Sequence, residues 1–166
     1  MEVGPVKALV VYDTVFGNTK QIALAIASAF GESTGVQAIS VADADSTCLQ
    51  ELDLLVVGSP TRGFKPTEAM TRFLRGLPKR SLEGTRAAAF DTRISAEDIR
   101  AGVLRFIVKS GGYAAPHISK GLTELGAQLI AAPEGFIVTA SGGPLRTGEC
   151  DRAADWAREL TELAGS

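Results

Sequence analysis

Short apolar runs alternate along the chain with segments in which apolar residues recur every three or four positions. Four runs are continuous and end in turn residues, and a fifth is weaker; they cover residues 6–12, 52–58, 85–91 and 134–140, with the weaker one at 36–40. Continuous apolar runs of this length are typical of strands buried on both faces, as in a parallel sheet covered by helices. The pattern therefore predicts a five-stranded parallel sheet.

The segments between the strands show the period of an amphipathic helix. In residues 19–30 the side chains of Ile22, Ile26 and Phe30 share one face, and Trp156 lies on the apolar face of the last segment. The predicted helices cover residues 19–30, 66–77, 117–126 and 149–164. Strands that alternate with helices predict an α/β fold, a doubly wound open sheet with helices on both faces.

Residues 95–112 fit this alternation poorly. Ile99, Val103 and Phe106 would share a helix face, yet the stretch VLRFIV within the segment also has the character of a strand. We expect a helix that packs as an extra crossover, and a lid over a site is the alternative.

Length and charge narrow the function. The 166 residues suit a single domain, 1–166, and the formal net charge of −2 without a basic stripe argues against nucleic acid. No apolar run approaches the roughly 20 residues of a membrane span, and no basic region opens a signal peptide. Two cysteines and one histidine form no disulfide framework and no metal cluster. We expect a cytoplasmic protein without a membrane or metal site, and we assign no catalytic residue.

The stretch VYDTVFGNT, residues 11–19, joins the first strand to the first helix and has the chemistry of a phosphate site. Thr14, Asn18 and Thr19 supply neutral donors, and Gly17 permits a sharp turn. The amino end of a helix also favours an anion. The loops typical of nucleotide triphosphates, dinucleotides and cysteine phosphatases are absent from the sequence. A plain connection in which Thr19 or Asn18 caps the helix is the alternative.

The same stretch resembles the phosphate-binding loop of the flavodoxin family. That pattern has a Ser or Thr, a small residue and a Thr at fixed spacing after an aliphatic and aromatic run, with Ala and an aliphatic residue following. The chain matches it at Val10, Val11, Tyr12, Thr14, Gly17, Thr19, Ala23 and Ile26. The resemblance implies a flavodoxin-like sheet of order 2-1-3-4-5 and a bound FMN whose phosphate lies on this loop.

Two further stretches resemble loops that contact the flavin. Residues 56–64, VVGSPTRGF, are similar to loops of flavodiiron proteins and of flavodoxin-like quinone reductases, and residues 88–94, AAFDTRI, stand at the following strand end. The resemblance implies that the cofactor-binding residues are Thr14, Val15, Phe16, Gly17, Asn18, Thr19, Ser59, Pro60, Thr61, Arg62, Gly63, Phe64, Asp91, Thr92 and Arg93.

The chain departs from electron-carrier flavodoxins in its aromatic residues. Those proteins often hold the ring between a Trp and a Tyr, whereas Arg62 stands near the Trp position here and residues 91–98 contain no aromatic. Phe64 and Tyr113 are the candidates for a stacking ring. A positive charge from Arg62 or Arg93 would favour an anionic flavin and raise its reduction potential.

These features predict an FMN-binding, flavodoxin-like redox protein that transfers electrons to a redox partner protein or a small quinone. We expect a monomer or a homodimer. Two alternatives stay open: an FMN-dependent NAD(P)H:quinone reductase, and a flavodoxin-fold interaction module that no longer binds flavin.

Overall fold

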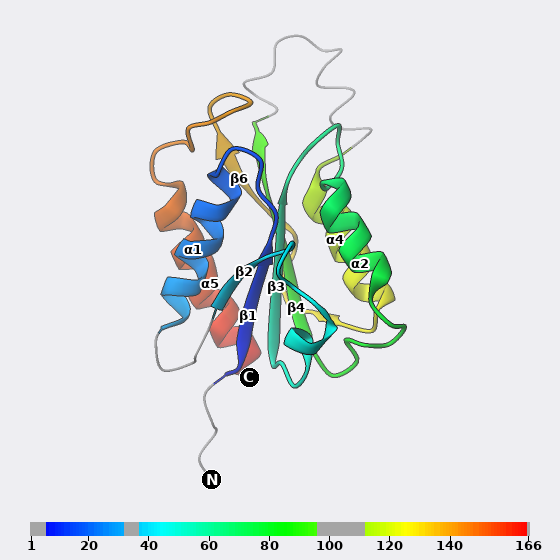
Figure 1. Ribbon diagram of the computed structural model, residues 1–166. Helices are drawn as coiled ribbons and strands as arrows, with labels where there is room; N and C mark the ends of the chain where they lie inside the picture. Colours follow the sequence, from blue (N-terminus) through cyan, green and yellow to red (C-terminus); the bar gives the residue numbers. More distant parts are fainter. Residues whose placement is uncertain (1–5, 32–36, 96–111, 166) are drawn as a thin grey trace.

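The computed structural model describes residues 6–31, 37–95 and 112–165 (Figure 1). Residues 96–111 lie outside the described residues, and with them almost all of the segment expected to form a helix or a lid. The strands are β1 (Ala8–Tyr12), β2 (Gln37–Ser40), β3 (Leu54–Pro60), β4 (Arg86–Ile94), β5 (Gln128–Leu129) and β6 (Glu134–Val138). The helices are α1 (Asn18–Phe30), η2 (Ser46–Leu49, a 3₁₀ helix), α2 (Glu68–Gly76), α4 (Ala114–Glu124) and α5 (Glu149–Ala164).

All strand pairs in the sheet are parallel, and the spatial order runs β2-β1-β3-β4. The predicted order is confirmed, but the fifth position is shared by two short strands that both pair with β4. β5 lies beside Arg86 and Ala87, and β6 lies beside the carboxyl half of β4, from Phe90 to Ile94. The residues between β5 and β6 include Pro133, which has no N–H to donate to a sheet. The strand predicted over 134–140 therefore ends at Val138 and has a short companion that the apolar pattern did not predict.

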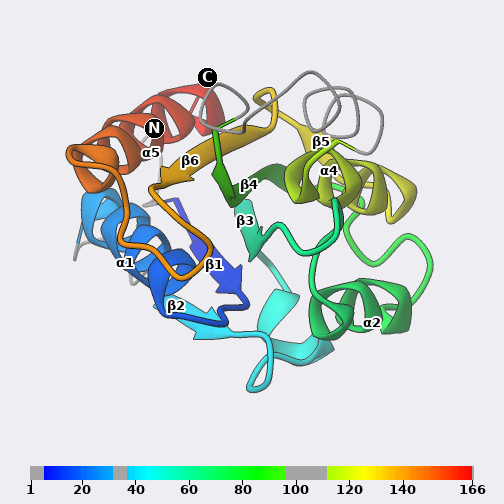
Figure 2. The ribbon, with the colours of Figure 1, turned by 90° about the horizontal axis from the view of Figure 1, so that it is seen from above.

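Helices cover both faces of the sheet, as predicted. α1 and α5 pack together on one face, and α2 and α4 lie on the other (Figures 1 and 2). α2 begins at Glu68 because the Thr67 hydroxyl accepts a hydrogen bond from the Met70 amide and caps the helix, so Pro66 precedes the helix and is not part of its first turn. α4 begins at Ala114, three residues before the predicted start.

The core forms one apolar layer on each side of the sheet. Between the sheet and α1 and α5, the rings of Phe90, Phe136 and Trp156 meet edge to face, with centroids 5.9–6.2 Å apart. A Cβ on Gly58 would lie 2.0 Å from the Phe90 ring, so only glycine fits at this point of β3. Trp156 is thus a core residue, as the sequence predicted.

Candidate functional site

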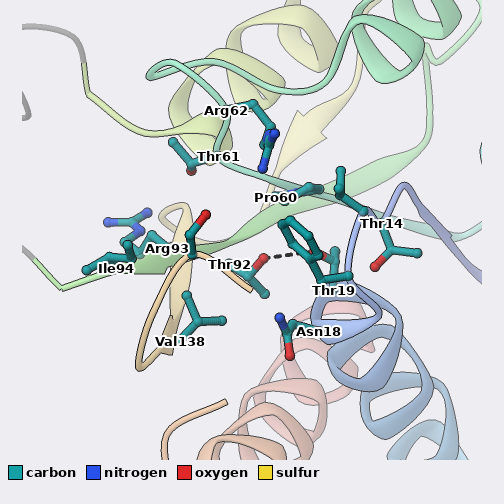
Figure 3. Close-up of a pocket in the computed structure, with 13 residues that line it drawn as sticks. Thr14, Asn18, Thr19, Pro60, Thr61, Arg62, Thr92, Arg93, Ile94 and Val138 are labelled. Atoms are coloured by element: carbon teal, nitrogen blue, oxygen red, sulfur yellow. Dashed lines mark hydrogen bonds between the residues drawn. The ribbon is translucent and has the colours of Figure 1, made fainter. Parts of the chain in front are cut away.

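A cleft of about 80 Å³ opens at the carboxyl ends of the strands, beside the amino end of α1 (Figure 3). The strand order reverses between β1 and β3, and in open α/β sheets ligands bind outside the strand ends at such a point. The volume suffices for several water molecules, so the cleft can enclose a group of phosphate size. The lining residues are Thr14, Val15, Phe16, Asn18, Thr19, Pro60, Thr61, Arg62, Thr92, Arg93, Ile94, Val138 and Ser141.

The loop between β1 and α1 is fixed by hydrogen bonds on its β3 side. The Asp13 amide donates to the Gly58 carbonyl at 3.0 Å, and the Asp13 carboxylate accepts from the Thr14 amide at 2.9 Å. The Thr67 hydroxyl donates to the other carboxylate oxygen of Asp13. Asp13 therefore ties the loop to the cap of α2 and leaves the Thr14 side chain facing the cleft.

The amino end of α1 has no side-chain cap. Gly17 stands at the cap position with φ 94°, a left-handed conformation that favours glycine. The first amide of the turn that donates to a backbone carbonyl is that of Gln21, which bonds to Gly17 at 3.1 Å. The amides of residues 18–20 thus remain available, and together with the helix dipole they favour an anion.

Side chains add further donors at the same point. The Thr14 hydroxyl oxygen accepts a hydrogen bond from the Gly17 amide at 3.0 Å, so its proton is free to be donated. Asn18 is only 8% exposed, and its side-chain amide has no hydrogen-bond partner in the part of the chain that the structure describes. The hydroxyls of Thr19 and Thr92 lie 2.8 Å apart and share one hydrogen bond. This bond uses one of their two protons, so the other proton can be donated to a ligand. These unpaired donors fit a phosphate group.

On the other side of the cleft, polar side chains already bond within the protein. The Thr61 hydroxyl accepts a hydrogen bond from the Ala114 amide at 3.1 Å, and the Asp91 carboxylate accepts one from the Ala115 amide at 2.8 Å. Thr61 and Asp91 together cap α4, which explains why this helix begins earlier than predicted. This side offers a ligand the side chains of Pro60 and Ile94 and the remaining proton of the Thr61 hydroxyl, while the Asp91 carboxylate is already bonded within the protein.

Arg93 lines the cleft, but its guanidinium is enclosed by neighbouring residues. Its guanidinium makes two hydrogen bonds to Asp91, at 2.6 and 2.8 Å, and stacks 3.6 Å from the centroid of the Tyr113 ring. A Cβ on Gly135 would lie 2.2 Å from Nε of Arg93, so glycine is needed beneath the guanidinium. Burial raises the pKa of Asp91, and the hydrogen bonds and charge of Arg93 oppose that rise.

Arg62 is the exposed counterpart of Arg93. The backbone groups of Arg62 and Lys65 exchange two hydrogen bonds, at 2.8 and 3.1 Å, across a tight turn whose central residues, Gly63 and Phe64, both have positive φ. The Arg62 guanidinium lies 5.6 Å from the centroid of the Phe16 ring, which is 56% exposed. Among the described residues, Arg62 forms no ion pair. Its charge at the mouth of the cleft is therefore uncompensated.

The structure brings ten of the fifteen predicted site residues to this cleft. The other five are Gly17, Ser59, Gly63, Phe64 and Asp91. Gly17 shapes the loop, and Gly63 and Phe64 form the turn behind Arg62. Ser59 is fully buried, where its hydroxyl accepts from the Thr67 amide at 3.0 Å. Asp91 pairs with Arg93 and caps α4, so its carboxylate is not free for a ligand.

The sequence interpretation missed Ile94 at the end of β4 and the residues at and after the end of β6. Val138 and Ser141 line the cleft, and Gly143 lies against Asn18, because a Cβ on Gly143 would be 2.6 Å from the Asn18 side-chain oxygen. The segment SGGP, residues 141–144, was a turn signal at a strand end and could have been added to the site on that ground. Tyr113, expected as a stacking candidate, is occupied by Arg93.

Two features that would point to other classes of site are absent from the described part of the chain. No described helix is long and apolar enough to cross a membrane. No group of three or more His, Cys, Asp or Glu side chains among the described residues is placed to hold a metal ion.

Comparison with known families matches residues 10–163 to the flavodoxin family. A flavodoxin from Picosynechococcus sp. is 42% identical over 50 residues, which are 30% of this chain and only 29% of that protein. The fold is similar to that of a flavodoxin from the domain Archaea, with a TM-score of 0.74 and 24% identity over 97% of this chain and 100% of that one.

Two further solved structures have the same fold. Flavodoxin 2 from Bacillus cereus gives a TM-score of 0.70 and 20% identity over 95% of this chain and 99% of that one. The rubredoxin oxygen:oxidoreductase of Desulfovibrio gigas also gives 0.70, with 17% identity over 98% of this chain but 37% of that larger one. At these identities the similarities establish the fold, and they confirm the predicted flavodoxin-like architecture.

Proposed function

The chain belongs to the flavodoxin family, and from this premise we propose that it is a redox protein that transfers electrons through a non-covalently bound FMN. The observation that carries the proposal is the set of unpaired donors at the amino end of α1. Thr14, Asn18 and the uncapped amides of residues 18–20 converge on one wall of the cleft. A phosphate dianion would use these donors without an ion pair, because the donors are neutral and the helix dipole supplies partial positive charge.

The ring of the cofactor would lie across the mouth of the cleft. Pro60, Thr61 and Arg62 border the mouth on the β3 side, and Thr92, Arg93 and Ile94 border it on the β4 side. Bound FMN supplies the electron-transfer chemistry, and the protein sets its position and electrostatic surroundings. Val15 and Phe16, which are 47% and 56% exposed, would shield part of the ligand from water.

The two arginines would act differently on a flavin. The charge of Arg93 is balanced by Asp91 through two hydrogen bonds, whereas Arg62 is exposed and without an acidic partner among the described residues. Arg62 is therefore the side chain expected to stabilise negative charge on the ring and to raise its reduction potential. We further propose that the protein acts in the cytoplasm as a monomer or a homodimer.

The direct test is titration of the purified protein with FMN and, separately, with riboflavin, which lacks the phosphate. We expect fluorescence quenching at micromolar FMN and much weaker binding of riboflavin. In the double variant Thr14→Val/Thr19→Val the affinity for FMN should fall by about 100-fold or more, because hydrogen bonds to charged groups contribute about 1.5–3 kcal/mol each. The riboflavin affinity should change little, so the preference for FMN over riboflavin shrinks by the same factor.

A matched control is Thr61→Val, which removes a hydroxyl that lines the same cleft but already caps α4. It should leave the preference for FMN over riboflavin unchanged. If FMN affinity survives in the double variant, the phosphate lies elsewhere. If the wild-type protein binds no FMN at micromolar concentration, the proposal fails, and the result favours the alternative of a flavodoxin-fold interaction module.

A second candidate is an FMN-dependent NAD(P)H:quinone reductase. The uncompensated charge of Arg62 at an open mouth favours it, because such a group can bind an anionic substrate beside the ring. Steady-state oxidation of NAD(P)H by a quinone tests this candidate. Turnover that is lost in Arg62→Gln while FMN binding persists would establish a reductase, and absence of turnover in the FMN-loaded protein would leave the electron carrier.

A further inference from the structure

A second concave region lies away from the cleft, between α2 and α4. The two helices lie side by side on the same face of the sheet (Figures 1 and 2), and the groove along them has a volume of about 610 Å³. The charged residues that line this groove are Lys65, Arg75, Lys79, Lys120 and Glu124, and His117 is a further lining residue. We call this region the α2–α4 groove.

The charge of the α2–α4 groove is the reverse of that of the whole protein. The chain carries more Asp and Glu than Lys and Arg, yet residues 65–80 contain five Lys and Arg and a single Glu. Lys65, Arg75, Lys79 and Lys120 are all exposed, and none of them forms an ion pair within the described ranges. An unpaired group of cations on an acidic protein attracts a negatively charged partner.

The floor of the groove is apolar. Leu74, Leu77 and Leu125 line it, and each is 8% exposed. Gly121 on α4 also lines the groove, and a Cβ at this position would be in ordinary van der Waals contact with Leu74, at 3.5 Å. The groove thus combines a narrow apolar floor with cations on its rim.

The groove borders the loop that also forms the cleft. Arg62 lines the cleft and Lys65 lines the groove, and their backbones are joined by the two hydrogen bonds across the turn at residues 62–65. Phe64 in this turn has φ 69°, which is rare for a bulky residue and is required here by the tight turn. A molecule bound in the groove would therefore contact the loop behind the mouth of the cleft.

We propose that the α2–α4 groove is a docking site for a partner protein, which presents an acidic segment with apolar residues at its centre. Glutamate or aspartate side chains of the partner pair with the rim, and its apolar residues rest on the leucine floor. A small phosphate compound fits less well, because the cations are spread over two helices and the two loops that flank α2, and do not converge on a point as the donors at α1 do. The proposal does not depend on FMN binding in the cleft.

The test uses a fluorescein-labelled peptide of about 15 residues, built from Glu and Leu as an amphipathic helix, and the same peptide with Gln in place of Glu. Binding to the full chain is measured by fluorescence anisotropy at low and at physiological salt. We expect the Glu peptide to bind, the Gln peptide to bind at least about tenfold more weakly, and salt to weaken the Glu peptide. Arg75→Glu/Lys120→Glu should weaken the Glu peptide by about tenfold or more.

The matched control is Lys7→Glu/Arg158→Glu, which changes the net charge equally with exposed residues that do not line the groove. It should change binding by less than about twofold. If Arg75→Glu/Lys120→Glu fails to fold, as judged by circular dichroism, Arg75→Gln/Lys120→Gln replaces it with an expected loss of severalfold. FMN titration of the same variants should be unchanged, so that failure here is distinct from failure of the proposed function.

Three results would overturn the proposal. The first is an equal loss of peptide binding in the groove variant and in the control variant, which would indicate attraction by net charge alone. The second is equal binding of the Glu and Gln peptides. The third is displacement of the Glu peptide by inorganic tripolyphosphate at lower concentration than by unlabelled Glu peptide, which would identify a phosphate site in place of a protein-docking surface.

Discussion

Around the cleft, the loop that leads into α1 and the carboxyl ends of β3 and β4 are both rich in polar side chains, but they use them differently. At α1, Thr14 and Asn18 retain donors that bond to nothing else in the described structure. At β3 and β4, Thr61 and Asp91 are committed to the first turn of α4, and Arg93 is committed to Asp91.

The difference separates groups that are available to a ligand from groups that stabilise the fold. Unpaired donors that are held in place cost little to reorganise when a ligand binds, whereas donors that already have partners would have to leave them. The hydroxyls of Thr14 and Thr61 each accept one backbone hydrogen bond, so the contrast rests on other residues. Asn18 has no hydrogen-bond partner among the described residues, whereas Asp91 and Arg93 bond to each other.

The largest expected effect comes from breaking the ion pair between Asp91 and Arg93, at the carboxyl end of β4. Arg93→Met leaves the buried carboxylate of Asp91 without its charge partner, and we expect the free energy of unfolding to fall by about 3–5 kcal/mol at neutral pH. The pKa of Asp91, already raised by burial, rises further without Arg93. Protonation of Asp91 removes its unpaired buried charge, so the difference in the free energy of unfolding between Arg93→Met and wild type should shrink as pH falls. Urea unfolding at several pH values measures both.

Two observations complete this test. The preference for FMN over riboflavin should survive in Arg93→Met, because the phosphate side is untouched. Arg158→Met breaks an ion pair whose side chains are 62% and 74% exposed, and it should cost no more than about 1 kcal/mol. A loss in Arg93→Met as small as in this control would show that the Asp91–Arg93 pair is not structural.

A smaller effect is expected on the α1 side, from Gly143→Ala. Gly143 and Gly148 have φ 96° and 88°, so alanine at either position should cost about 1–2 kcal/mol of stability. Only at Gly143 does the new Cβ collide with a side chain, that of Asn18. We expect Gly143→Ala to weaken FMN binding by severalfold and Gly148→Ala to leave it unchanged. Equal FMN affinity in both variants would remove Asn18 from the phosphate site.

The smallest effect concerns a carboxylate outside the cleft that resembles Asp91 in its contacts. Glu149 on α5 is 3% exposed and accepts hydrogen bonds from Arg152 and from the Ile137 amide. Although burial opposes it, these hydrogen bonds lower the pKa of Glu149. Its stabilisation is therefore present above about pH 4.5 and lost as pH falls through the lowered pKa.

Glu149→Gln should accordingly lower stability by about 1 kcal/mol at neutral pH, a modest loss because the partner arginines are 38% and 53% exposed. The difference from wild type should vanish in acid. Thermal unfolding between pH 3 and 7 would show this convergence, and a constant difference across that range would mean that the charge of Glu149 does not contribute.

Local patterns in the sequence were sufficient to predict the main strands and the loop that enters α1, and the resemblance to the flavodoxin family supplied the order of the sheet. Buried strands are continuous apolar runs, and the loop Thr14–Gly17–Thr19 is a contiguous motif whose chemistry can be interpreted without tertiary contacts. The division of the fifth strand was not predicted, because β5 contributes only two residues and has no pattern of its own.

The contacts of Thr61, Asp91 and Arg93 within the protein could not be predicted, for a different reason. Thr61 bonds to Ala114, Asp91 to Ala115, and Arg93 stacks on Tyr113, so each contact joins positions more than 15 residues apart. Sequence chemistry suggested ligand contacts for Thr61, Asp91 and Arg93 because all three are polar and stand at strand ends. Only the fold shows which of these side chains already have partners.

The contacts of α5 with β6 have a consequence for solubility. β6 pairs with β4 alone among the described strands, so its outer side would otherwise offer free backbone groups for strand addition by another molecule. The Ile137 amide donates to Glu149, the Ile137 carbonyl accepts from the Arg146 amide, and the Gly135 carbonyl accepts from Arg152. Side chains of one helix and one turn of backbone thus occupy the sheet edge, and protection against edge-to-edge aggregation depends on keeping Glu149 and Arg152.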